Sequence, residues 1–93
     1  MPLGCCWIEI HIPAAASLKD KRRVVKSILG RVRSRFNVSA SEMDEQDLWQ
    51  RALLAVACVS NNKTLIDQTF EKIRAGIENQ GECYVIRFET EFL

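Results

Sequence analysis

Two segments with the hydrophobic period of a helix each lie between segments that alternate like strands, and this order leaves few folds open. The first segment, Leu3 to Ile12, alternates as a half-buried strand does. Its core face is predicted to hold Cys6, Ile8, Ile10 and Ile12, and its other face Cys5, Trp7, Glu9 and His11. The first element is therefore a strand with one buried side.

A helix is predicted from about Leu18 to Ser34. Ser17 and Asp20, three residues apart, form the kind of capping box that marks a helix start. An apolar stripe covers about a third of the helix circumference and is predicted to be buried. The stripe consists of Leu18, Val25, Ile28, Leu29 and Val32.

Two further strands, a second helix and a last strand follow. Phe36 to Met43 and about Leu48 to Val59 are predicted to form a hairpin, joined by an acidic link that contains Asp44, Glu45 and Asp47. The second helix begins after the cap-type residues Ser60 to Asn62, ends at Gly81, and is predicted to bury Leu65, Ile66, Phe70, Ile73 and Ile77. The last strand, Tyr84 to Leu93, alternates again, with Tyr84, Ile86 and Phe88 opposite Val85, Arg87 and Glu89.

The resulting order of elements is βαββαβ. Right-handed crossovers that place both helices on one face give an α+β, ferredoxin-like sandwich. Its four-stranded antiparallel sheet is predicted to have the strand order 4-1-3-2. The 93 residues suffice for one domain, residues 1–93, and are too few for two.

The sequence also predicts where the protein resides. Its longest uninterrupted apolar run, Ala52 to Val59, has eight residues, whereas a membrane span needs about 20. Residues 1–12 contain no Lys or Arg and include Glu9, unlike an export signal. We therefore expect a cytoplasmic protein without membrane contact, with reduced thiols rather than disulfides or metal ligands at Cys5, Cys6, Cys58 and Cys83.

Positive charge is concentrated in residues 19–35, which carry a net charge of +7 while the rest of the chain carries −6. Five of these cations fall within about 100° of the helix circumference, beside the apolar stripe. This group, called the basic flank below, consists of Lys19, Arg22, Arg23, Lys26 and Arg33. Arg31 and Arg35 point elsewhere, toward the helix end or the acidic link. Three interpretations of the basic flank are open: a solvated helix face, a site for nucleic-acid phosphates, or a site for an acidic protein patch.

Four stretches of the sequence form a recognisable set: IEIHIP at 8–13, SLKDKRRVVKS at 17–27, RFNVSASE at 35–42 and DLWQRA at 47–52. They resemble the small bacterial YlxP-like family, a domain of unknown function, over nearly the whole chain. The resemblance implies a ferredoxin-like fold, a bacterial cytosolic protein and, for some members, genes beside translation and ribosome-maturation factors. It implies no established activity. The family-like positions are His11, Pro13, Ser17, Leu18, Lys19, Lys21, Arg22, Arg23, Asn37, Glu42, Trp49 and Gln50.

Few residues support catalysis. His11, the only histidine, shares its strand face with Trp7 and Glu9 and has no nucleophile near it in sequence, so a structural role is favoured. The acidic link lacks the ligand spacing and the glycine of a calcium loop. Phosphate-loop, dinucleotide-binding and hydrolase motifs are absent from the sequence. Ala14 to Ala16 stand where an acylphosphatase-type anion loop needs glycines. We expect neither an enzyme nor a cofactor.

RNA-recognition motifs share this topology but stack bases on aromatic residues of the central strands. Ala52 to Val59 contains neither an aromatic nor a basic residue. We therefore expect ribosomal RNA or a ribosome assembly particle to bind through phosphates along the basic flank, with Asn37 and Trp49 as additional contacts. The alternative is a homodimeric interaction protein, because a sheet covered on one side leaves apolar residues exposed beside Trp7: Leu54, Val56 and Cys58, or their neighbours.

Overall fold

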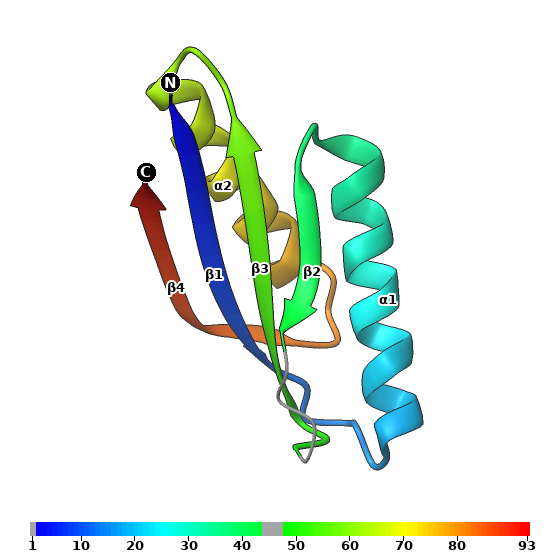
Figure 1. Cartoon of the computed structure of the whole chain (residues 1–93). Helices are drawn as coiled ribbons and strands as arrows, with labels where there is room; N and C mark the ends of the chain where they lie inside the picture. Colours follow the sequence, from blue (N-terminus) through cyan, green and yellow to red (C-terminus); the bar gives the residue numbers. More distant parts are fainter. Residues whose placement is uncertain (1, 44–47) are drawn as a thin grey trace.

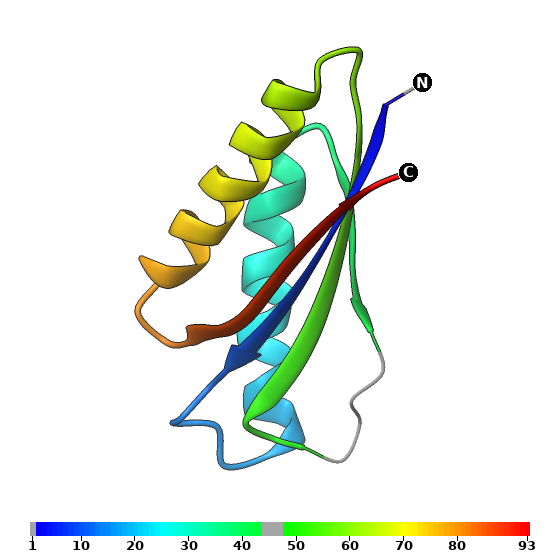
Figure 2. The same cartoon turned by 90° about the vertical axis from the view of Figure 1, so that its left-hand side faces the viewer.

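The computed structural model describes residues 2–43 and 48–93, which form four strands and two helices (Figure 1). In chain order they are β1 (Leu3–His11), α1 (Leu18–Arg35), β2 (Ser39–Met43), β3 (Arg51–Val59), α2 (Lys63–Glu78) and β4 (Tyr84–Phe92). The strands form one antiparallel sheet in the order β2-β3-β1-β4, and both helices cover the same face of it (Figure 2). This is the ferredoxin-like arrangement with strand order 4-1-3-2 that the sequence predicts.

Strand β1 is the centre of the core. It pairs with β3 on one side and with β4 on the other. Its inward side chains Cys6, Ile8 and Ile10 are inaccessible to solvent, as the alternation predicts. The same core includes side chains from β3 and both helices, among them Leu54, Val56, Val25, Ile28, Ile66, Phe70 and Ile73. One hydrophobic layer between sheet and helices therefore determines where both helices lie.

Helix α1 begins where Ser17 predicts. The Ser17 hydroxyl oxygen accepts a hydrogen bond from the Asp20 N–H over 3.1 Å, and the Asp20 carboxylate accepts one from the Ala16 N–H over 3.0 Å. The capping box therefore forms, except that the hydrogen bond to the Asp20 carboxylate comes from the N–H of Ala16 instead of that of Ser17. The helix ends at Arg35, one residue beyond the prediction, and Leu18 is half-buried rather than buried. Its buried residues are Lys21, Val24, Val25, Ile28, Leu29 and Val32.

The hairpin strands are shorter than the sequence predicts. β2 begins at Ser39 rather than Phe36, because the Phe36 N–H donates to the Val32 carbonyl over 3.0 Å and so ends α1. The Phe36 side chain packs against the core. β3 begins at Arg51 rather than Leu48. The acidic link of Asp44, Glu45 and Asp47 lies outside the described residues.

Helix α2 is capped by Asn62, whose side-chain oxygen accepts hydrogen bonds from the N–H groups of Thr64 and Leu65 over 2.9 and 3.3 Å. The helix ends before Gly81, which has a φ of 94°, in the left-handed region that favours glycine. Four of the five predicted core positions are buried. Leu65 is 49% exposed, so its predicted burial is wrong. It lies about 100° around the helix from Ile66 and so points away from the sheet.

Strand β4 departs from simple alternation. Its pairing with β1 shifts between Glu9 and Ile10, which leaves Ile86 as the extra residue of a β-bulge. The bulge brings Val85 and Phe88 to the same face, where both pack against the core. The prediction that one face holds Tyr84, Ile86 and Phe88 is therefore wrong, and the first two of these side chains are exposed.

Gly4 is the point of closest approach between β1 and α2. A Cβ atom added at Gly4 would lie 2.5 Å from Cγ2 of Ile66 and 3.1 Å from Cε2 of Phe70. We predict that Gly4→Ala lowers the free energy of unfolding by about 1–3 kcal/mol, because the packed core has to shift. Gly30→Ala is the matched control, since a Cβ there meets nothing within 4 Å. It should raise the free energy of unfolding by about 1 kcal/mol through helix propensity. Equal urea midpoints for the two variants would contradict this account.

Candidate functional site

Helix α1 lies at one side of the molecule, beside the sheet edge that β2 forms (Figure 1). All five residues of the basic flank are exposed, as the helical projection predicts. They come from one 18-residue helix, which extends about 27 Å and is held by its buried side. The basic flank is therefore a strip on a rigid element rather than a set of loop cations.

Two members of the basic flank have partners within the protein. Arg33 donates from Nε and Nη2 to the Ala40 carbonyl of β2 over 3.2 and 2.6 Å. Arg23 forms an ion pair with Glu82, with Nη2 and Oε2 2.8 Å apart. This hydrogen bond raises the pKa of the Arg23 guanidinium and lowers the pKa of the Glu82 carboxyl. The Arg33 guanidinium is held against a neutral carbonyl, so its positive charge is not neutralised. The positive charge of Arg23 is neutralised by the Glu82 carboxylate.

The other three members, Lys19, Arg22 and Lys26, have no ion pair or hydrogen bond from their side chains to any part of the chain that the structure describes. They are spaced three and four residues apart, so they lie on one strip of the helix surface. Like charges at these spacings repel each other by a few tenths of a kcal/mol per pair. An anion that binds to all three would relieve this repulsion.

Lys21 belongs to the same basic segment but lies inside the protein. Its side chain is 3% exposed, and its ammonium group lies 3.4 Å from a carboxylate oxygen of Glu42 on β2. Together with Arg33, this contact ties α1 to the edge strand of the sheet. Sequence reasoning missed the pair, although on the helical projection Lys21 falls inside the apolar stripe, between Ile28 and Val32.

Gln50 positions the loop that leads into α1. Its side-chain amide donates to the carbonyls of Pro13 and Ala15 over 3.1 and 3.3 Å, and its backbone carbonyl accepts from the Ile12 N–H over 2.8 Å. The family-like positions Pro13 and Gln50 are thus in contact, 37 residues apart. Gln50 therefore supports the start of the helix that carries the basic flank.

The same loop does not offer an anion site of the acylphosphatase type. Such a site needs backbone N–H groups that point at the ligand. Here the Ala15 N–H donates to the Ile12 carbonyl over 3.2 Å, and the Ala16 N–H donates to the Asp20 carboxylate. Both amides are already engaged, and that of Ala16 already binds a carboxylate.

Asn37 and Trp49, the two additional contacts that the sequence predicts, are not brought together. Both are exposed. Asn37 follows the last turn of α1. Trp49 precedes β3, and that strand begins near the opposite end of α1 (Figure 1). Neither residue therefore lies beside the middle of the strip formed by Lys19, Arg22 and Lys26.

The face of the sheet opposite the helices carries a second notable surface, called the open face below (Figure 2). Its apolar centre is formed by Trp7 of β1 and by residues of β3 paired with that strand: Leu53, Ala55 and Ala57. Leu54, Val56 and Cys58 face the helices and are buried. The exposed apolar residues are thus the neighbours of those three, which was one of the two arrangements the sequence allowed.

Polar pairs surround this apolar centre. Arg51 lies 3.8 Å from the Glu9 carboxylate, and Arg87 lies 2.9 Å from the Glu89 carboxylate. The His11 ring stacks on the Tyr84 ring with their centroids 5.8 Å apart. His11 therefore has an aromatic neighbour on β4 rather than a nucleophile.

Three of the four cysteines, Cys6, Cys58 and Cys83, are buried in the core, whereas Cys5 is half-buried. Burial raises the pKa of the Cys6 thiol to about 12 and also raises the pKa values of Cys58 and Cys83. Such thiols are protonated at neutral pH and are poor nucleophiles. Within residues 2–43 and 48–93, no three side chains of His, Cys, Asp or Glu come together as metal ligands would. Neither helix of this part is long and apolar enough to cross a membrane.

Comparison with known proteins places these features in a family. A family model described as "Protein of unknown function (DUF503)" matches residues 3–90. The uncharacterized protein YlxP of Bacillus subtilis (strain 168) is 40% identical over 90 residues, which cover 97% of this chain and 98% of that protein. The solved structure of protein YJCS superposes with a TM-score of 0.62 at 10% identity over 96% of both chains. A putative chlorite dismutase has a TM-score of 0.59 at 12% identity over 99% of this chain and 44% of its own. The two structures share the fold.

The Arg23–Glu82 pair predicts a pH effect. Because the folded-state pKa of Glu82 is lowered, this pair stabilises the fold above the ordinary pKa of a glutamate, and the contribution is lost as the pH falls through the lowered value. We expect Arg23→Gln to raise the pKa of Glu82, measured by NMR titration of its side-chain carboxyl carbon. Arg22→Gln is the control and should leave that pKa unchanged. An ordinary Glu82 pKa in the unmodified protein would refute the ion pair.

Proposed function

Because the chain belongs to the DUF503 family of proteins of unknown function, as its sequence resemblance predicts, we propose its function from its own surface: it binds RNA phosphates through the basic flank of α1. The observation that carries the proposal is the strip of exposed cations without an acidic partner among the described residues, Lys19, Arg22 and Lys26. Arg33 adds positive charge from a fixed position beside them.

The geometry of α1 favours phosphate binding. The three cations are separated by about 4.5 and 6 Å along the helix axis. Their backbone is anchored by the buried stripe, so they lose less conformational freedom on binding than cations on a loop would. The net charge of +7 in residues 19–35 attracts a polyanion to this side of the molecule.

The same geometry predicts how RNA is recognised. Lysine and arginine on an exposed helix contact phosphates, which position a nucleic acid without reading its sequence. At the centre of the open face β3 contributes Leu53, Ala55 and Ala57, none of which offers a ring for base stacking, and Trp7 of β1 is only partly exposed. Binding is therefore expected to be similar for unrelated RNAs. Ribosomal RNA is the proposed target class, because the family resemblance implies for some members genes beside translation factors.

The experiment is a salt titration of binding to ribosomal RNA. Three phosphate contacts to a single strand give a slope of log affinity against log salt concentration of about −2. We predict that the double variant Arg22→Gln, Lys26→Gln binds more weakly to every RNA and loses about 1.4 of that slope. Glutamine keeps helix propensity, so the variant separates charge from folding. Ribosomal subunits should accordingly sediment with the unmodified protein at low salt and without it at high salt.

Arg31→Gln, Arg35→Gln is the matched control, because it removes the same charge from the same helix but outside the basic flank. Its salt slope should equal that of the unmodified protein. A folded Arg22→Gln, Lys26→Gln variant with unchanged affinity and slope would mean that the basic flank is a solvated helix face.

A second function is favoured by the open face. We propose that two copies associate through it, because Trp7 and Leu53 form a partly exposed apolar centre on a sheet whose helices lie on the other side. An interface of this kind relates the same surface of both copies by a two-fold axis. The polar pairs that surround the apolar centre would then form the rim of the interface.

Light scattering tests the association. We expect a particle of twice 10.6 kDa at micromolar concentration. Leu53→Glu places a charge in the apolar centre and should give a particle of 10.6 kDa. Leu65→Glu makes the same change at an exposed leucine of α2 and should leave the dimer intact. A 10.6 kDa particle for the unmodified protein would exclude the dimer. It would not bear on the proposal of RNA binding.

A further inference from the structure

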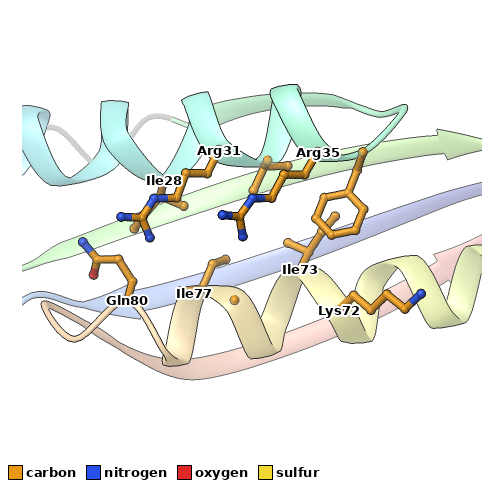
Figure 3. A pocket seen from close by; sticks show the side chains of 10 residues that line it. Ile28, Arg31, Arg35, Lys72, Ile73, Ile77 and Gln80 are labelled. Atoms are coloured by element: carbon orange, nitrogen blue, oxygen red, sulfur yellow. The ribbon is translucent and has the colours of Figure 1, made fainter.

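A groove runs between α1 and α2 (Figure 3). On the helical projection of α1, its residues Arg31 and Arg35 lie away from the basic flank. The floor of the groove is apolar and is formed by residues of both helices and of the turn after α1: Ile28, Val32, Phe36, Ile73 and Ile77. Gly76 lines it from α2, and a Cβ added there would meet nothing within 4 Å. Because a glycine stands where a side chain would face α1, the two helices leave a cavity of about 60 Å³.

The residues that line this groove include three cations and no acid. Arg31 and Arg35 extend from α1 toward α2, and Lys72 lies on α2 with its amino group directed away from them (Figure 3). Neither arginine side chain has a hydrogen bond or ion pair within the described residues. The acid that feels the charge of Arg31 is Glu82, which Arg23 already binds. The groove thus joins an apolar floor to two guanidinium groups that no carboxylate of the described residues binds.

We propose that this groove binds a short acidic segment of another protein, with one aliphatic side chain on the floor and flanking carboxylates on Arg31 and Arg35. Arginine binds carboxylates with two parallel hydrogen bonds, and the two residues are one helical turn apart. Positive groove and negative segment are complementary in charge, which both steers the encounter and selects the partner.

The volume and the floor favour a peptide over RNA. A cavity of 60 Å³ holds roughly four to six water-sized groups, which corresponds to one aliphatic side chain and is smaller than a nucleobase. A phosphate gains nothing from an apolar floor, whereas a leucine or valine side chain gains by leaving water. A second copy of this chain is not the proposed partner, because contact between two different surfaces of identical chains continues into a ring or a filament.

The groove and the basic flank lie on nearly opposite sides of α1, so the peptide site does not depend on RNA binding. The probe is a capped peptide, Asp-Glu-Leu-Glu-Asp, titrated into the isotopically labelled full chain and followed by NMR. We expect saturable shifts of backbone amides that line the groove, Arg31, Ile73, Gly76 and Ile77. The peptide with serine in place of leucine should bind about tenfold more weakly, because it leaves the floor exposed.

Two variants disrupt the groove in different ways, one by removing charge and one by filling the space. Arg31→Gln, Arg35→Gln removes the carboxylate partners, and Gly76→Leu fills the groove without changing charge. Each should weaken binding of the leucine peptide about tenfold or more. Arg22→Gln, Lys26→Gln removes equal charge from the basic flank and should bind the peptide as the unmodified protein does.

Three results would overturn the proposal. The first is an absence of saturable shifts at the groove up to millimolar peptide. The second is equal affinity for the serine peptide, which would mean charge attraction alone. The third is that single-stranded oligouridylate, rather than the peptide, shifts the groove amides in an Arg31- and Arg35-dependent manner, which would make the groove part of the RNA site.

Discussion

Burial of one face of β1 is the constraint on which the rest of the structure depends. Cys6, Ile8 and Ile10 are removed from water only because both helices lie over the same side of the sheet. Gly4 lets α2 approach the strand, and Ile66 and Phe70 use the space that its missing side chain leaves. The helices are thus held as rigid rods by a single hydrophobic layer, while the other face of the sheet carries no helix.

This one-sided packing gives α1 two separate charged surfaces. Its apolar stripe has to face the sheet, so the cations in residues 19–35 are left on its solvent side and along its boundary with α2. Lys21 is the exception: it points inward and is compensated by Glu42 at the sheet edge. Arg33 and Arg23 contact Ala40 and Glu82, rather than serving as free ligands. Helix α1 thus carries the strip of Lys19, Arg22 and Lys26, which we propose for phosphates, and borders the apolar groove, which we propose for an acidic peptide.

The sequence predicts those features that depend on local periodicity, namely the element order, the strand order and the exposure of the basic flank. It misses those set by contacts between distant segments. The bulge at Ile86 arises from the register of β4 against β1, and nothing in the spacing of its own residues marks it. The partners of Arg23 and Arg33 lie in other elements, so helical projection alone could not show which cations are engaged. Lys21 differs, because its position inside the apolar stripe was visible in the sequence.

The central claim is that RNA phosphates meet the basic flank of α1 and no other surface. Mapping by NMR, with a single-stranded ribosomal RNA fragment titrated into the isotopically labelled full chain at low salt, tests it most directly. We expect saturable shifts of Lys19, Arg22 and Lys26 that disappear when salt is added, while Trp7 and Leu53 of the open face stay unchanged. Shifts centred on the open face, or none on α1, would contradict the account.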